Sequence, residues 1–248
     1  NALSEALVAA IGETCERVAA DLDARALVLH GAGGHFSAGA DFGGFLALMQ
    51  TPSGQADDPI AHYNRRFGAM LERLAALPVP TIAVVTGVAM GGGCGLAAAC
   101  DRVIAADDAT FAMPEVTLGV APAQIAPFIV RRAGARRARW LMLGAARLKG
   151  PDALAAGLAD VVVNLAGLRA ALEAELRLLA AAEPAALRAT KRIVNRTLEA
   201  PLAAALDAAA LEFAGLLRHG AAVEGIAASR ARRAPAWTTP PPELPDFT

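Results

Sequence analysis

The sequence predicts an α/β fold with a helical lobe at its C-terminal end, and three observations support this prediction. Short apolar, β-branched runs such as Ile82–Thr86 are typical of buried strands. The longer segments between them carry apolar residues at helical spacing. From Leu168 onward the sequence is helix-forming, with breaks near Pro184, Pro201 and Gly220. Strands that alternate with helices build an α/β core, and a later run of helices adds a lobe to it.

The first half of the chain is expected to hold two long helices. Apolar residues at helical spacing predict a helix over Ala2–Leu22, and a buried strand follows over Arg25–His30. A second helix is predicted over Tyr63–Leu77, and Pro78 ends it. The polar, turn-rich segment Thr51–Pro59 predicts a loop before that helix.

The second half continues the alternation and then becomes helical. Beyond the central strand we expect three helices and one strand, at Gln124–Ala133, Arg136–Leu143, Pro151–Ala156 and Asp160–Val163 respectively. These patterns predict an α/β core in residues 1–166 and a helical lobe in residues 167–248.

A glycine-rich junction between a strand and a helix is the most informative stretch. Ile82–Thr86 is followed by Gly91–Gly93, and the next residues, Cys94–Cys100, are small and helix-permissive. Such a junction leaves backbone N–H groups without partners before the first helical turn, and glycines let a ligand atom approach the backbone closely. Glu115 lies downstream. Backbone donors together with one carboxylate suit acid/base chemistry beside a carbonyl group.

Each of these signals also has a purely structural interpretation. A glycine triplet alone fits a helix that packs tightly on a strand, and Glu115 alone fits an exposed surface carboxylate. A dinucleotide-binding fingerprint is excluded, because Gly31-x-Gly33 has Phe36 where the third glycine is needed. The sequence contains no phosphate-binding P-loop motif either.

Composition and charge restrict the classes of function. With 55% apolar residues the chain has material for a sizeable core, and its net charge of −1 argues against a broad nucleic-acid or anionic-membrane surface. No apolar run reaches the ~20 residues that a membrane-spanning helix needs. Three cysteines without a C-x-x-C pair and four histidines without metal-ligand spacing predict a reduced, cytoplasmic chain with no metal site. We therefore expect neither nucleic-acid nor membrane partners.

Five segments resemble the enoyl-CoA hydratase/isomerase (crotonase) superfamily. Its G-x-A-x-GGG, L-A-x-x-C-D and F-x-x-P-E-x-x-L-G patterns are matched by Gly87–Gly93, Leu96–Asp101 and Phe111–Gly119. Phe36–Asp41 matches the F-x-A-G-x-D pattern, and Gly157–Val162 resembles G-L-V-x-x-V. The matches occur in the family's order, so they indicate the superfamily strongly and the reaction only weakly, because this scaffold hosts many chemistries.

The resemblance implies a ββα spiral core whose C-terminal helical lobe packs on a neighbouring subunit, in a homotrimer or a dimer of trimers. It also implies that no metal or redox cofactor is used, since coenzyme A arrives as part of an acyl-CoA substrate. In the family, a β-hairpin precedes the tetrapeptide that matches Asn1-Ala2-Leu3-Ser4. We therefore expect that the natural N-terminus, with any targeting information, lies before this sequence.

The resemblance also assigns site residues. The backbone N–H groups of Ala40 and Gly92 correspond to the two donors to the thioester oxygen, which together form an oxyanion hole, and Glu115 corresponds to a catalytic glutamate. A further group is expected to bind the substrate or coenzyme A: Ala38, Asp41, Phe42, Gly91, Gly95, Pro114 and Gln124.

One departure from the family pattern bears on the substrate. Hydratases with two catalytic glutamates carry the second one where this chain has Gly95. The glycine predicts free volume and one negative charge less in the pocket, which favours an acyl group that is branched at its β-carbon and carries its own carboxylate. Residues 119–128 resemble bacterial hydratases of branched glutaconyl-CoA esters, the methylglutaconyl-CoA and isohexenylglutaconyl-CoA hydratases of leucine and terpene degradation. Gln124 is expected to donate a hydrogen bond to the substrate carboxylate.

The predicted activity is therefore hydration of an enoyl-CoA, and two alternatives stay open. One is a double-bond isomerase that uses Glu115 alone. The other is a non-catalytic family member that binds acyl-CoA or serves in assembly. The dehalogenase branch of the family is rejected, because it needs an aspartate nucleophile near residues 121–124 and none is present.

Overall fold

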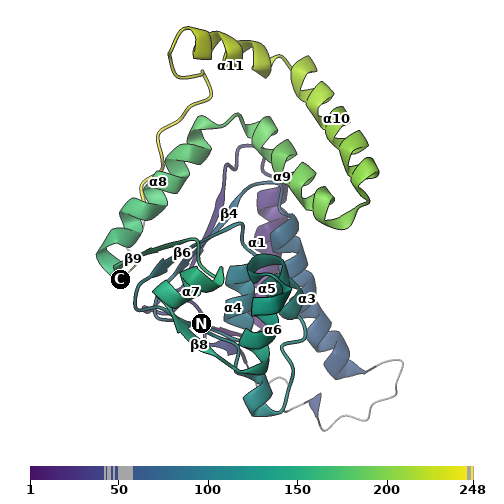
Figure 1. Cartoon of the computed structure of the whole chain (residues 1–248), viewed down its shortest axis with the longest axis vertical. Helices are drawn as coiled ribbons and strands as arrows, with labels where there is room; N and C mark the ends of the chain where they lie inside the picture. The colour runs from purple at the N-terminus through teal and green to yellow at the C-terminus, as the bar shows by residue number, and fades with distance from the viewer. Residues whose placement is uncertain (42, 44–45, 47, 50–57, 245–246, 248) are drawn as a thin grey trace.

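The structure is a computed structural model that describes residues 1–41, 43, 46, 48–49, 58–244 and 247 (Figure 1). Of the loop predicted over Thr51–Pro59, residues 51–57 lie outside the described residues, as does Phe42 of the predicted site. Pro59 itself belongs to a helix.

A four-stranded parallel sheet forms the centre of the molecule. Its strands lie in the order β2-β4-β6-β9, with bounds Leu27–His30, Thr81–Val85, Arg102–Ala106 and Val161–Val163. Every residue of β4 is buried, as its β-branched sequence predicts. The predicted strand at 25–30 is shorter and only half-buried, because β2 is an edge strand of this sheet.

Two smaller sheets adjoin the central one. In the first, β5 (Val88–Met90) pairs in parallel with β7 (Thr110–Ala112), which pairs antiparallel with β8 (Arg147–Lys149). In the second, β1 (Ala2–Leu3) pairs in parallel with β3 (Gly39–Ala40). A bridge between Ser37 and Ala89 brings the start of β3 to β5.

Helices cover these sheets, and two of them differ in bounds from the prediction. α1 (Glu5–Ala20) begins later than expected, because Ala2 and Leu3 form a strand and the Ser4 side chain accepts the N–H of Leu7 at 3.3 Å. α3 (Pro59–Ala76) begins four residues earlier than expected, because Asp58 caps it and Pro59 suits the first helical position.

The remaining helices before the lobe agree closely with their predicted positions. They are α4 (Gly92–Ala98), α5 (Ala126–Ala133), α6 (Ala135–Leu143) and α7 (Gly150–Ala156). Two short 3₁₀ turns that the sequence did not predict are η1 (Glu115–Leu118) and η2 (Leu165–Gly167).

Four helices complete the chain: α8 (Leu168–Ala181), α9 (Pro184–Glu199), α10 (Leu202–Arg218) and α11 (Ala221–Arg230). Their breaks fall where Pro184, Pro201 and Gly220 predict them. Leu168 and Leu172 of α8 belong to the same core cluster as the central sheet, whereas α10 and α11 arch away from the sheets (Figure 1). The division into 1–166 and 167–248 stays a prediction. Within the described part of the chain, no helix is both long and apolar enough to cross a membrane.

A partly buried charge network fastens α9 to the central sheet. The Nζ of Lys191, a side chain that is 9% exposed, donates to the Asp101 carboxylate at 2.5 Å and to the Val79 carbonyl at 2.9 Å. The N–H and hydroxyl of Thr81 donate to the same carboxylate oxygen, at 2.7 and 3.0 Å. Asp101 therefore holds a helix and a strand together.

Candidate active site

The glycine junction forms the centre of the site. β5 ends at Met90, Gly91 takes φ 51° and ψ −118°, and α4 begins at Gly92. The N–H of Gly91 donates to the Ala112 carbonyl at 2.8 Å, and the first helical bond runs from the N–H of Gly95 to the Gly91 carbonyl at 3.1 Å. Gly92 comes before Gly95, the first residue whose N–H takes part in a helical hydrogen bond. The helix itself therefore provides no acceptor for the N–H of Gly92. The positive φ explains the glycine at position 91.

The segment that carries Ala40 lies directly against this junction. The N–H of Ser37 donates to the Val88 carbonyl at 2.9 Å, and the N–H of Met90 returns a bond to the Ser37 carbonyl at 3.0 Å. A β-carbon built on Gly39 would lie 3.4 Å from the backbone nitrogen of Gly92. The fold therefore brings the two segments with the predicted donors into contact, although they are about 50 residues apart in the sequence.

The orientation of the Ala40 N–H follows from the pairing of β3. The next amide along the strand, that of Asp41, donates to the Leu3 carbonyl of β1 at 3.5 Å. Successive amides of a strand point in opposite directions. The N–H of Ala40 therefore points away from β1.

Glu115 places its carboxylate beside the glycine junction. One carboxylate oxygen, Oε1, lies 3.0 Å from a β-carbon built on Gly91, so any side chain at position 91 would displace it. The other, Oε2, is buried and has no hydrogen-bond partner within the described structure. Burial raises the pKa of Glu115 above its ordinary value, and a hydrogen bond from its own backbone N–H offsets part of this. Such a carboxylate is suited to proton transfer near neutral pH.

The thiol next to this carboxylate is not a nucleophile. Burial, and secondly the negative charge of Glu115, raise the pKa of Cys94 to about 12. A thiol with that pKa stays protonated at neutral pH. Glu115 is therefore the acid/base group that the geometry places at this junction.

Three other predicted binding residues, Ala38, Asp41 and Pro114, are at least partly exposed. Ala38 and Asp41 are exposed, and the Asp41 carboxylate accepts the N–H of Gly43 at 3.0 Å. Pro114 is the cap of η1, and its carbonyl accepts the Thr117 hydroxyl at 2.7 Å. Their contact with a substrate stays a prediction.

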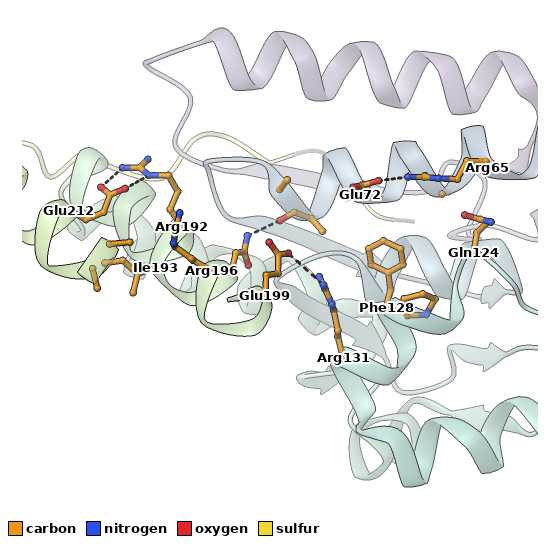
Figure 2. Close-up of a pocket in the computed structure, with 17 residues that line it drawn as sticks. Arg65, Glu72, Gln124, Phe128, Arg131, Arg192, Ile193, Arg196, Glu199 and Glu212 are labelled. Atoms are coloured by element: carbon orange, nitrogen blue, oxygen red, sulfur yellow. Dashed lines mark hydrogen bonds and ion pairs between the residues drawn. The ribbon is translucent and has the colours of Figure 1, made fainter. Parts of the chain in front are cut away.

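The side chain of Gln124 packs on Gly68 of α3, where its Cδ would lie 2.8 Å from a β-carbon built on that glycine. Gln124 lines a pocket of about 660 Å³ between α3, α5, α9 and α10 (Figure 2). Glu115 and Gly91–Gly93 are not among the described residues that line this pocket. The predicted hydrogen bond from Gln124 to a substrate carboxylate stays a prediction.

The predicted free volume at Gly95 is wrong. A β-carbon built on Gly95 would lie 2.6 Å from the Cβ of Ile125 and closer still to its Cγ2 methyl. Ile125 is 3% exposed and packs against the glycine. Ile125 lies in the run of residues 119–128, but nothing in that run predicts its contact with Gly95, because the two residues are 30 positions apart.

The sequence predicts that its possible metal ligands form no metal site. Among the residues that the structure describes, no group of three or more His, Cys, Asp and Glu side chains is arranged to hold a metal ion.

Comparisons with known proteins agree on one family. The sequence model of the Enoyl-CoA hydratase/isomerase family matches residues 1–240. The chain is 37% identical to an enoyl-CoA hydratase/isomerase structure from Marinobacter aquaeolei, with a TM-score of 0.92 over 96% of this chain and 91% of that one. It is 33% identical over 239 residues to a probable enoyl-CoA hydratase, echA8, of Mycobacterium leprae, covering 96% of this chain and 90% of the relative.

A third relative is the 2,3-dehydroadipyl-CoA hydratase of Escherichia coli, 32% identical over 237 residues, which cover 95% of this chain and 89% of the relative. The similarity to solved structures confirms the α/β fold class with its C-terminal helical region.

Proposed function

Because the chain belongs to the enoyl-CoA hydratase/isomerase (crotonase) family, we propose that this enzyme adds water across the α,β-double bond of a branched glutaconyl-CoA thioester. The observation that carries the proposal is the carboxylate of Glu115, which lies against Gly91, the residue before α4, and has one buried oxygen without a hydrogen-bond partner among the described residues.

The thioester oxygen binds the N–H groups of Ala40 and Gly92. Support comes from the contact between Gly39 and Gly92, and from an Ala40 N–H that points away from β1. Negative charge develops on this oxygen when water adds to the β-carbon, and fixed donors stabilise that charge without having to reorganise. Removing one such donor typically costs about 3–4 kcal/mol, a loss of ~10²–10³ in rate.

Glu115 transfers the protons. As its carboxylate accepts a proton from water, the hydroxyl oxygen bonds to the β-carbon and the π electrons move toward the thioester. The glutamic acid then donates a proton to the α-carbon and becomes a carboxylate again. The upward shift of its pKa supports this double role, because a carboxyl with a higher pKa is a stronger base as the carboxylate and brings its titration closer to neutral pH.

The choice of substrate rests on charge. With Gly95 in place of a glutamate, the face beside Glu115 has one negative charge fewer, so a substrate carboxylate meets less repulsion there. The compound in the name of the E. coli relative, 2,3-dehydroadipyl-CoA, also has a carboxylate at the far end of its acyl chain.

The three buried free thiols, Cys15, Cys94 and Cys100, are compatible with a cytoplasmic location.

A second candidate is a double-bond isomerase, which the single carboxylate at the junction favours. The test is a spectrophotometric assay in which crotonyl-CoA is compared with 3-methylglutaconyl-CoA and isohexenylglutaconyl-CoA. We expect loss of conjugation with uptake of water, and a higher kcat/KM for at least one branched ester. A shifted double bond without water uptake would establish the isomerase. Binding without turnover would indicate a non-catalytic member, and equal hydration of crotonyl-CoA would refute the substrate assignment.

A further inference from the structure

Ser37 carries a buried hydroxyl in the segment that leads to Ala40. The residue is 1% exposed. Its Oγ donates to the Asn1 carbonyl at 2.8 Å and accepts the N–H of Gly39, two residues ahead, at 3.2 Å. A hydroxyl group can both donate and accept hydrogen bonds, and this one does both. The second bond closes a local turn around Ala38 through the side chain rather than the backbone.

The backbone of the same residue is bonded to β5, which leads into the glycine junction. The N–H of Ser37 donates to the Val88 carbonyl at 2.9 Å, and its carbonyl accepts the N–H of Met90 at 3.0 Å. A β-carbon built on Gly93 would lie 2.6 Å from the Ser37 carbonyl oxygen and 2.8 Å from its Cβ, so α4 begins in contact with this residue. Ser37 therefore contacts the junction through its backbone and the opposite segment through its side chain.

Gly39 has no side chain with which to fix its own conformation. Its φ of 91° favours glycine, and a β-carbon there would lie 2.5 Å from the Met90 carbonyl oxygen, so a larger residue does not fit. Because glycine rotates more freely than other residues, the peptide group that carries the Ala40 N–H must be held by its surroundings. The pairing of β3 with β1 and the hydrogen bond to the Ser37 hydroxyl provide this restraint.

We propose that Ser37 is a positioning residue for the oxyanion hole: its hydroxyl fixes the direction of the Ala40 N–H relative to that of Gly92. This inference rests on the function proposed above. Without the hydroxyl, the buried N–H of Gly39 loses its acceptor, and the backbone rotates to find another. The Ala40 N–H turns with it, and a displacement of about 1 Å at a site of reaction can cost ~10² in rate.

The test compares Ser37→Ala with Thr81→Val, which removes another buried hydroxyl. The Thr81 hydroxyl donates to the Asp101 carboxylate at 3.0 Å and accepts the Asp101 N–H at 2.9 Å, so it also joins two segments. Thr81 is the first residue of β4, at the end of the strand that lies farther along the chain from the glycine junction. Both variants should lower Tm, but only Ser37→Ala should change the site.

The first measurement is steady-state kinetics of enoyl-CoA hydration. In Ser37→Ala we expect kcat and kcat/KM to fall together by ~10–10²-fold with little change in KM, because the charge on the thioester oxygen develops in the transition state. Ser37→Cys should lie between Ser37→Ala and the wild type, since a thiol is a weak donor and acceptor. Thr81→Val should keep the wild-type kcat.

The second measurement needs no turnover. Butyryl-CoA, a saturated thioester, is isotope-labelled at its carbonyl carbon and bound to each protein, and its C=O stretching frequency is recorded by infrared difference spectroscopy. Hydrogen bonds to the thioester oxygen lower this frequency, so the shift on binding reports the two donors. The wild type and Thr81→Val should show the same shift, and Ser37→Ala a clearly smaller one.

The two measurements separate this inference from the proposed reaction. If the wild type hydrates no enoyl-CoA but the carbonyl shift shrinks in Ser37→Ala alone, the proposed hydration fails and the positioning role stands. An unchanged shift in Ser37→Ala, or equal losses in Ser37→Ala and Thr81→Val, would refute the positioning role. A wild type that binds butyryl-CoA without any shift would also refute it, because there would be no donor pair to position.

Discussion

At the scale of single residues, Glu115 is the group on which the proposed chemistry depends. Glu115→Gln keeps the shape of the side chain but removes its ability to transfer a proton. We expect kcat to fall by at least ~10², with a smaller effect on acyl-CoA binding. Steady-state kinetics together with binding of a saturated acyl-CoA separate the two effects, and a nearly unchanged kcat would mean that the catalytic carboxylate lies elsewhere.

Although Glu115→Gln should lower kcat, it should raise the stability of the folded protein at high pH. Because burial raises the pKa of Glu115, the folded protein favours the protonated carboxyl, and ionisation penalises folding as the pH rises through that pKa. At a pH below the ordinary pKa of glutamate the group is protonated in both states, and the penalty is absent. The Tm of Glu115→Gln should therefore exceed that of the wild type at pH 8, and the difference should shrink toward pH 4. A lower Tm at pH 8 would contradict this account.

Gly92 permits a test of a single backbone donor. Gly92→Pro removes the N–H at the first helical position, where proline is otherwise accepted, so we expect loss of turnover by ~10²–10³ in a folded protein. Gly92→Ala is the matched control, because it adds a β-carbon near the Leu3 methyl and the Phe67 ring but keeps the N–H. Circular dichroism checks the fold. Equal activity in the two variants would remove Gly92 from the oxyanion hole.

At the scale of secondary-structure elements, α9 depends on the network of the buried Lys191 and Thr81 with the partly exposed carboxylate of Asp101. Lys191→Met keeps the apolar stem but leaves the Asp101 carboxylate without its ammonium partner. We expect a loss of about 2–3 kcal/mol in the free energy of unfolding, measured by urea denaturation. Arg192→Met, on the same helix, breaks the exposed ion pair with Glu212 and should cost less than about 1 kcal/mol. Equal losses of unfolding free energy in the two variants would show that the Lys191 network stabilises the fold no more than an exposed ion pair does.

At the scale of the whole molecule, α10 and α11 leave an unusual amount of apolar surface uncovered. Seven large apolar side chains on these helices are each more than half exposed: Leu202, Leu206, Leu211, Phe213, Leu217, Val223 and Ile226. Many exposed large apolar side chains on neighbouring helices are typical of protein–protein interfaces. We therefore propose that the helices pack on neighbouring copies, in the homotrimer or dimer of trimers that the family resemblance implies.

This assembly is tested by light scattering after gel filtration at micromolar concentration. We expect a trimer or hexamer for the wild type, and a smaller species for Phe213→Glu/Leu217→Glu, because two charges on α10 would have to be buried. Leu22→Glu is the control, since Leu22 is 81% exposed outside this region and its substitution should leave the assembly intact. A monomeric wild type would refute the proposal.

The sequence alone determined the α/β class, the long helices and the segments that carry Ala40, Gly92 and Glu115. Helical periodicity over ten or more residues and glycines at fixed offsets are local signals, so they predict local structure well. It did not reveal β5, β7 and β8, because a three-residue strand is too short to show a period, and its partners are distant in the chain.

Only the tertiary structure decided how the site is enclosed. It placed Ile125 in the space beside Gly95, which the sequence suggested was open, and it packed Gln124 against Gly68 of α3, where Gln124 lines a pocket. A glycine indicates that a side chain is missing, but what fills the vacated volume depends on packing between elements far apart in the chain. Interiors are packed as densely as crystals, so space next to a buried glycine is taken by whichever neighbour the fold brings there.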